Sequence, residues 1–151
     1  PLVDNVCRRL HVSNMYRDIA VMTAREHGNI RRSSELRSKT AVMVLERCDA
    51  FRRPERFVDV INATECDLRG RKSDTVSFED IPFPQRDYWM MILNAAKSID
   101  AAAIIQSMDD ASEEIPRALH NARVDAAADA VNAMRFGHIK KIEVGKKDAI
   151  P

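Results

Sequence analysis

The feature that most constrains the fold is the spacing of apolar residues, which lies near 3.6 residues wherever the chain is periodic. In segment 54–69 the residues on one helical face are Phe57, Val60, Ile61 and Thr64. Only four glycines interrupt the chain, and aromatic residues make up 5% of it, which favours helices over sheets. The sequence therefore predicts an all-α fold, a bundle of about seven helices.

Start and stop signals set the expected bounds of these helices. We expect helices over residues 2–10, 14–27, 40–51, 54–69, 85–99, 101–106 and 112–136. Pro54 suits the first turn of its helix, and Asp100 suits an N-cap. Helix ends are expected at Gly28, Gly70 and Gly137. In segment 85–99 the expected apolar face is Tyr88, Met91, Ile92 and Ala95, with Trp89 beside it.

Two prolines suggest how the chain is organised. Pro82 and Pro84 enforce extended backbone, so we expect a hinge near Pro82–Pro84 between two helical sub-bundles. The expected parts are 1–72, the rear of a helical body, then 73–137, a helical tail, and 138–151, a flexible basic C-terminus.

Composition excludes several classes of protein. No run approaches the roughly 18 apolar residues of a membrane span, and no signal peptide opens the chain, so we expect a cytoplasmic protein with no membrane partner. Neither a Cys-x-x-Cys pair nor a glycine-rich phosphate loop is present. No nucleophile–base pattern is legible, so we predict no catalytic residue. Assembly as a homodimer stays open.

A net charge of +1 does not indicate a nucleic-acid binder, so any such case rests on local clustering. Six cations gather within about twenty residues and are our candidate RNA-binding residues: Arg52, Arg53, Arg56, Arg69, Arg71 and Lys72. Arginine forks suit phosphate groups. About half of the six are expected to serve as structural partners of nearby carboxylates. Beside a predicted loop, Arg69, Arg71 and Lys72 are the stronger candidates.

A second basic group closes the helix that precedes Gly28. Its members are Arg25, His27, Arg31 and Arg32. The helix dipole accounts for cations at a C-terminus, so this group is explained as solvated surface, with phosphate contact as the alternative.

Three blocks give the chain a family resemblance: DAFRRPERF from Asp49, ATECDLRGR from Ala63, and FEDIPFPQRDY from Phe78. Their order and spacing resemble the C-terminal half of bacterial CCA-adding enzymes, the tRNA nucleotidyltransferases. The similarity covers residues 6–131 and includes EIPRALHNARVDA, which is similar to the family's final helix. It departs at RKSDTVSFED, which is longer than the family's link, and after Phe136. Nothing here resembles the family's nucleotidyltransferase head.

The resemblance implies a role and a set of partners. The parent enzyme would add CCA to tRNA 3′ ends from CTP and ATP, with Mg²⁺ in the head that this chain lacks. The helical rear would grip tRNA, and ATP and CTP would be bound only through the head. The chain alone is then expected to hold no cofactor and to be inactive in nucleotide addition.

The resemblance also gives Asp49 a second meaning. It places this residue at the last acidic position of an HD-type phosphohydrolase domain, whose site binds a divalent transition metal. An adjacent His-Asp pair is missing, and the four histidines are scattered. The alternative is an ion pair with Arg52 or Arg53, which would explain an acidic residue near a helix C-terminus. Two further functions stay open: part of a phosphohydrolase, or a helical interaction module without an RNA role.

Overall fold

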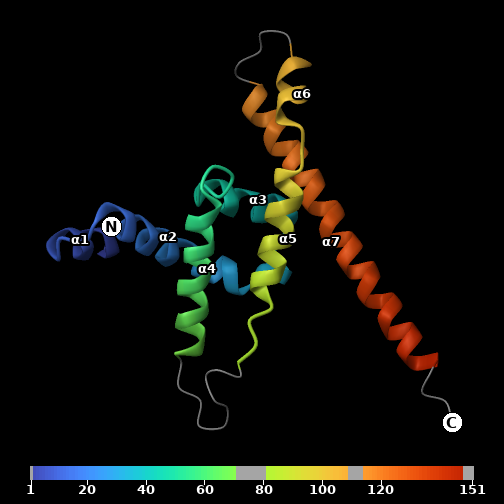
Figure 1. Ribbon diagram of the computed structural model, residues 1–151, viewed down its shortest axis with the longest axis horizontal. Helices are drawn as coiled ribbons and strands as arrows, with labels where there is room; N and C mark the ends of the chain where they lie inside the picture. Colours follow the sequence, from blue (N-terminus) through green and yellow to red (C-terminus); the bar gives the residue numbers. More distant parts are fainter. Residues whose placement is uncertain (1, 71–80, 109–113, 148–151) are drawn as a thin grey trace. The chain divides into compact units, whose positions relative to one another are not determined.

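The computed structural model describes residues 2–70, 81–108 and 114–147, with side chains to residue 135. Over these ranges the chain forms seven α-helices, one 3₁₀ turn and no strand, which confirms the all-α prediction (Figure 1). The elements in chain order are α1 (Leu2–Arg9), α2 (Asn14–Arg31), η1 (Ser33–Glu35), α3 (Ser38–Arg47), α4 (Pro54–Arg69), α5 (Gln85–Lys97), α6 (Ala101–Gln106) and α7 (Ile115–Lys147). None of the described helices is both long enough and apolar enough to span a membrane.

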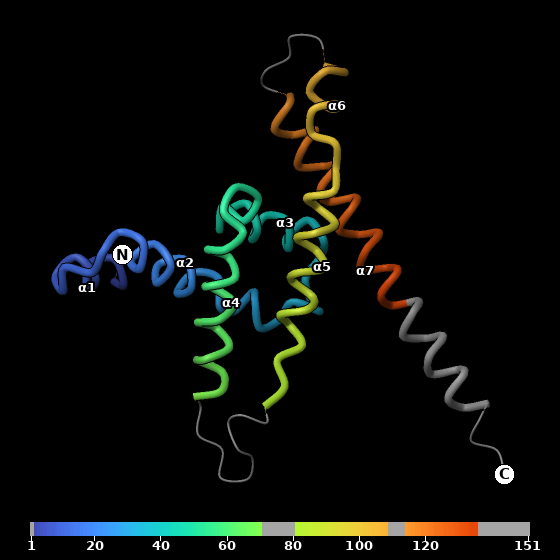
Figure 2. Tube along the Cα trace, in the orientation of Figure 1, coloured from blue at the N-terminus to red at the C-terminus, as the bar shows by residue number. Residues whose placement is uncertain are grey.

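The chain divides into two compact units, Pro1–Met90 and Met91–Pro151, and the division falls inside α5. In the first unit α2 packs against α1, α3 and α4. The tube in Figure 2 shows α4 and the start of α5 running in opposite directions. The largest fully buried apolar side chains of this unit are Trp89, Phe57, Ile30, Leu45 and Ile61. The hinge near Pro82–Pro84 stays a prediction.

Helix α4 follows its sequence pattern closely. Pro54 occupies its first turn, Gly70 is its C-cap, and the four residues of the predicted stripe are buried. Thr64 is a polar member of that stripe, and its hydroxyl donates a 2.8 Å hydrogen bond to the carbonyl of Val60. A buried hydroxyl is tolerated because it has this partner.

Helix α2 extends beyond the end that we predicted at Gly28. It continues to Arg31, so that Gly28 lies inside the helix. Glycine inside a helix costs about 1 kcal/mol relative to alanine. The extra turn compensates by burying Ile30 completely. The carbonyl of Ile30 also accepts a 3.2 Å hydrogen bond from Trp89 Nε1, and the carbonyl of Arg31 accepts one of 3.1 Å from Gln85 Nε2.

Trp89 is part of the buried face of α5 rather than beside that face, which corrects our expectation for α5. Its side chain is fully buried, and its ring meets Phe57 edge to face at 5.5 Å between centroids. Ile92, Leu93 and Ala96 are the buried residues further along α5, whereas Met91 is only half-buried.

A partly buried ion pair, between exposed Arg47 and buried Glu26, joins α2 to α3. Arg47 donates from Nε to Glu26 Oε1 at 2.7 Å and from Nη2 to Oε2 at 2.9 Å, and Asn29 donates to Oε2 at 2.8 Å. Burial of Glu26 favours the protonated form, but the hydrogen bonds from Arg47 and Asn29 outweigh it, so the pKa of Glu26 is lowered. The bidentate geometry is the one that holds a carboxylate most firmly.

In the second unit α6 packs against α7. Asp100 caps α6 as predicted, since its Oδ1 accepts a 2.9 Å hydrogen bond from the backbone N–H of Ala103. Helix α7 continues to Lys147, so the end that we predicted near Phe136 and Gly137 was wrong. Residues 138–147 include four lysines and a glutamate, which are good helix formers, and no proline that would force a stop.

Candidate nucleic-acid interface

The turn between α3 and α4 gives Asp49 a structural task. Its φ of 54° lies in the left-handed region. Its N–H donates to the carbonyl of Glu46 at 3.0 Å, while the N–H of Ala50 donates to Leu45 at 2.9 Å. These two bonds form a Schellman motif, in which the left-handed position usually holds glycine and sometimes a short polar residue. Asp49 therefore ends α3 through its backbone.

The Asp49 side chain sits between two arginines. Arg52 Nε and Arg53 Nε each lie 3.8 Å from one of its carboxylate oxygens, which confirms the ion-pair reading of this residue. The backbone N–H groups of both arginines also donate to the carbonyl of Asp49, at 3.2 and 2.9 Å. The side chains remain 75% and 48% exposed. Long, exposed ion pairs are weak, so both guanidinium groups stay available to an anion.

Arg56 and Arg69 lie in closer ion pairs. Arg56 Nη2 is 2.9 Å from Asp18 Oδ2, which ties α4 to α2, and its side chain is only 17% exposed. Arg69 Nη2 is 2.7 Å from Glu65 Oε1 and is 33% exposed. Structural pairing of this kind is what we expected for part of the cluster. Arg69 is less exposed than Arg52, although we expected it to be the stronger RNA candidate. Arg71 and Lys72 lie outside the described residues.

A further set of cations lies where α2, η1 and α3 meet. We call it the basic corner; its members are Arg31, Arg32, Arg37 and Lys39. In the part of the chain that the structure describes, none of the four has a carboxylate oxygen within 4.0 Å. Arg31 and Arg32 belong to the second basic group seen in the sequence, whereas we did not predict a role for Arg37 or Lys39. The available signal was four cations within nine residues with Glu35 as the single carboxylate.

The arrangement around Asp49 does not fit a metal centre. Its carboxylate faces two guanidinium groups, which compete with a cation for the same oxygens. Burial, followed by the negative charge of Glu26, raises the pKa of the neighbouring Cys48 thiol to about 12, so that it stays protonated and is a poor ligand. Within the described ranges no group of three or more His, Cys, Asp or Glu side chains could hold a metal ion.

Comparison with known proteins gives clear relatives. The "Multifunctional CCA protein" of Herminiimonas arsenicoxydans is 49% identical over 138 residues, which are 89% of this chain and 32% of that protein. The protein of the same name from Janthinobacterium sp. (strain Marseille) is 48% identical over 134 residues, 86% of this chain and 31% of that protein. No family model matches the chain, and no solved structure matches it.

The relatives agree with the resemblance that the three sequence blocks suggested. The chain is homologous to a part of multifunctional CCA proteins, and it spans about a third of the length of the curated relatives it matches.

Proposed function

We propose that this chain, a homologue of part of the multifunctional CCA proteins, is the C-terminal helical region that grips tRNA in a CCA-adding tRNA nucleotidyltransferase. The observation that carries the proposal is the 49% identity over 89% of the chain. In the intact enzyme, a nucleotidyltransferase head outside this chain binds CTP, ATP and Mg²⁺ and performs nucleotide addition. This region contributes binding energy and orientation, and no catalytic residue.

Recognition in this proposal rests on shape and phosphate contacts. Structured RNA has a deep, narrow major groove that side chains do not read, so proteins hold it through phosphate and 2′-hydroxyl groups. Arg52 and Arg53 suit such contacts, because their side chains are exposed and their pairs with Asp49 are long. Arg71 and Lys72 are further candidates by sequence. Arg56 and Arg69 support the fold through Asp18 and Glu65.

We expect this polypeptide to bind tRNA with an affinity that falls steeply as salt rises, because each phosphate contact releases counterions. Removing two contacts with the Arg52→Ala/Arg53→Ala variant should reduce the slope of log affinity against log salt by about 1.8, at roughly 0.9 per contact. The Arg71→Ala/Lys72→Ala pair should act in the same way. Fluorescence anisotropy of labelled tRNA at several salt concentrations measures both.

The matched control is Arg8→Ala, which removes an arginine that is 63% exposed and paired with Asp4 on α1. It should leave the slope unchanged if the effect belongs to the α3–α4 turn. Salt-insensitive association with RNA would contradict the proposal and favour a helical interaction module. A phosphohydrolase role has no support from the surroundings of Asp49.

A further inference from the structure

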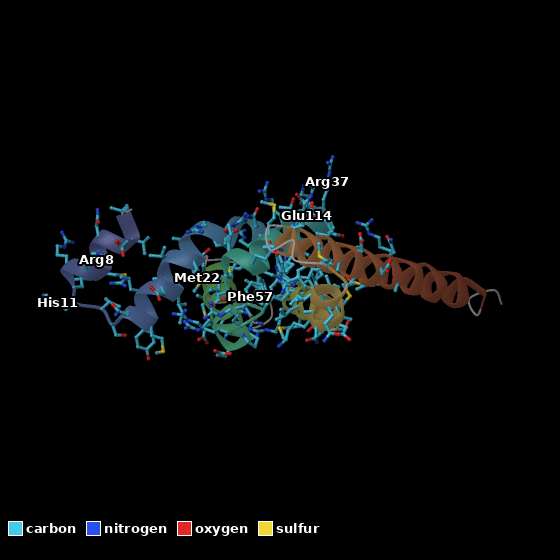
Figure 3. All side chains as sticks on the ribbon, turned by 90° about the horizontal axis from the view of Figure 1, so that it is seen from above. Arg8, His11, Met22, Arg37, Phe57 and Glu114 are labelled. Carbon is cyan, nitrogen blue, oxygen red and sulfur yellow. The ribbon has the colours of Figure 1, made fainter. Side chains whose placement is uncertain are left out.

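Within the described residues, the cations of the basic corner lack carboxylate partners, unlike the arginines of α4. Arg56 and Arg69 are each within 2.9 Å of a carboxylate oxygen, whereas the four corner cations have none within 4.0 Å among the residues that the structure covers. Arg32, Arg37 and Lys39 are exposed, and Arg31 is half-buried. Figure 3 shows the Arg37 side chain projecting away from the ribbon. Residues 31–39 therefore carry four positive charges and a single carboxylate, that of exposed Glu35.

The helix dipole explains only half of this charge. Arg31 lies in the last turn of α2 and Arg32 is its C-cap, where cations are favoured. Arg37 and Lys39 stand at the opposite kind of end: Arg37 is the N-cap of α3 and Lys39 lies in its first turn, which contains no acidic residue. Cations are disfavoured there because the helix N-terminus is itself positive. An anionic ligand is the physical reason that would make this placement favourable.

The backbone beneath these side chains is held in place. The last carbonyls of α2 accept hydrogen bonds from Trp89 and Gln85 of α5. In the 3₁₀ turn the N–H of Glu35 donates to Arg32 at 2.9 Å, and the N–H of Leu36 donates to the buried Ser33 at 3.2 Å. Little backbone ordering is then required when a ligand binds, and preordered groups bind more tightly for the same contacts.

We propose that the basic corner binds consecutive phosphate groups of an RNA backbone, as a second contact surface apart from the α3–α4 turn. This inference rests on the proposed function, since it takes the RNA to be tRNA. Arg32, Arg37 and Lys39 would contact phosphate oxygens, whereas Glu35 would oppose binding. Arginine forks and a lysine point charge both suit this ligand.

The test compares two variants in the tRNA-binding assay, one that removes positive charges from the corner and one that removes its negative charge. Arg32→Ala/Arg37→Ala/Lys39→Ala should reduce the salt slope by about 2.7, at roughly 0.9 per lost contact. Glu35→Gln should strengthen tRNA binding, a gain that damage to the fold would not produce. The triple variant should resist thermal unfolding at least as well as the parent chain, because two cations at the N-terminus of α3 are removed.

The outcomes separate this inference from the proposed function. If the parent chain binds tRNA in a salt-dependent way and neither variant changes that binding, the basic corner is not an RNA-binding surface. The proposed function would still stand. If the parent chain shows no salt-dependent tRNA binding, the proposed function fails and the corner fails with it. A lower slope in the triple variant together with tighter binding by Glu35→Gln supports the corner.

Discussion

Replacing Trp89 with alanine is expected to lower the free energy of unfolding of the first unit by about 4 kcal/mol. The side chain is fully buried and packs edge to face on Phe57, so its removal leaves a cavity among α2, α4 and α5. Its indole N–H also satisfies the carbonyl of Ile30. Native domains are stable by only 5–15 kcal/mol in general, so this loss is a large share. Urea denaturation followed by far-UV circular dichroism measures it.

Two controls define what the Trp89 result means. Trp89→Phe keeps most of the ring but leaves the Ile30 carbonyl without its donor, which should cost about 1–3 kcal/mol. Tyr16→Ala removes an aromatic side chain that is 63% exposed and should change stability little. An alanine variant at position 89 as stable as the parent chain would show that Trp89 does not anchor this core.

The second large effect is expected at Arg47. Its replacement with alanine leaves the Glu26 carboxylate, which is 2% exposed, without its bidentate partner. Breaking a buried pair from one side typically costs 3–5 kcal/mol. Arg47 is 34% exposed, and water therefore partly replaces it, so we expect the lower end, about 3 kcal/mol. Urea denaturation at neutral pH measures the difference.

The pH dependence of stability distinguishes loss of the Glu26–Arg47 pair from general damage to the fold. In the parent chain the pKa of Glu26 is lowered from its ordinary 4.5. The ionised carboxylate therefore stabilises the fold above that pH, and this stabilisation is lost as pH falls below it. Without Arg47, burial should raise the pKa of Glu26. Protonation of the unpaired carboxylate in acid then removes its buried charge and reduces the destabilisation of the variant. The difference in unfolding free energy between the two proteins should therefore narrow as pH falls, beginning above pH 4.5 where the variant's Glu26 takes up a proton.

A double variant, Glu26→Met/Arg47→Met, removes both charges and should recover most of the lost stability. Arg8→Ala, which breaks an exposed pair of similar length, should leave stability nearly unchanged. A gap that stays constant from neutral pH to pH 4 would contradict the role assigned to the Glu26 carboxylate.

Features set by neighbours in the sequence were predictable. The all-α class, the buried stripe of α4 and the Asp100 cap all follow from residues within one or two turns of each other. The pairing of Asp49 with Arg52 and Arg53 is equally local. In such cases spacing along the helix fixes which groups can meet.

Features that depend on distant residues were not predictable. Gly70 ends α4 as expected, whereas Gly28 does not end α2. The helix continues past Gly28 because Ile30 is buried and its carbonyl accepts a hydrogen bond from Trp89, 59 residues away. Arg56 pairs with Asp18, which lies 38 residues earlier in the chain. The sequence indicated that some arginines of the cluster would pair with carboxylates, but it did not identify this partner. The four cations of the basic corner are visible in the sequence, but their lack of carboxylate partners among the described residues is known only from the structure.

The position of Trp89 also makes the protein its own optical probe. It is the only tryptophan in the chain, and its indole N–H is bonded to the residue directly before Arg31. Indole emission responds to polarity and to hydrogen bonding at this nitrogen. A charged molecule bound at the basic corner lies next to the end of α2 and would alter that emission without moving the backbone. Intrinsic fluorescence can thus report occupancy of the basic corner without any added dye.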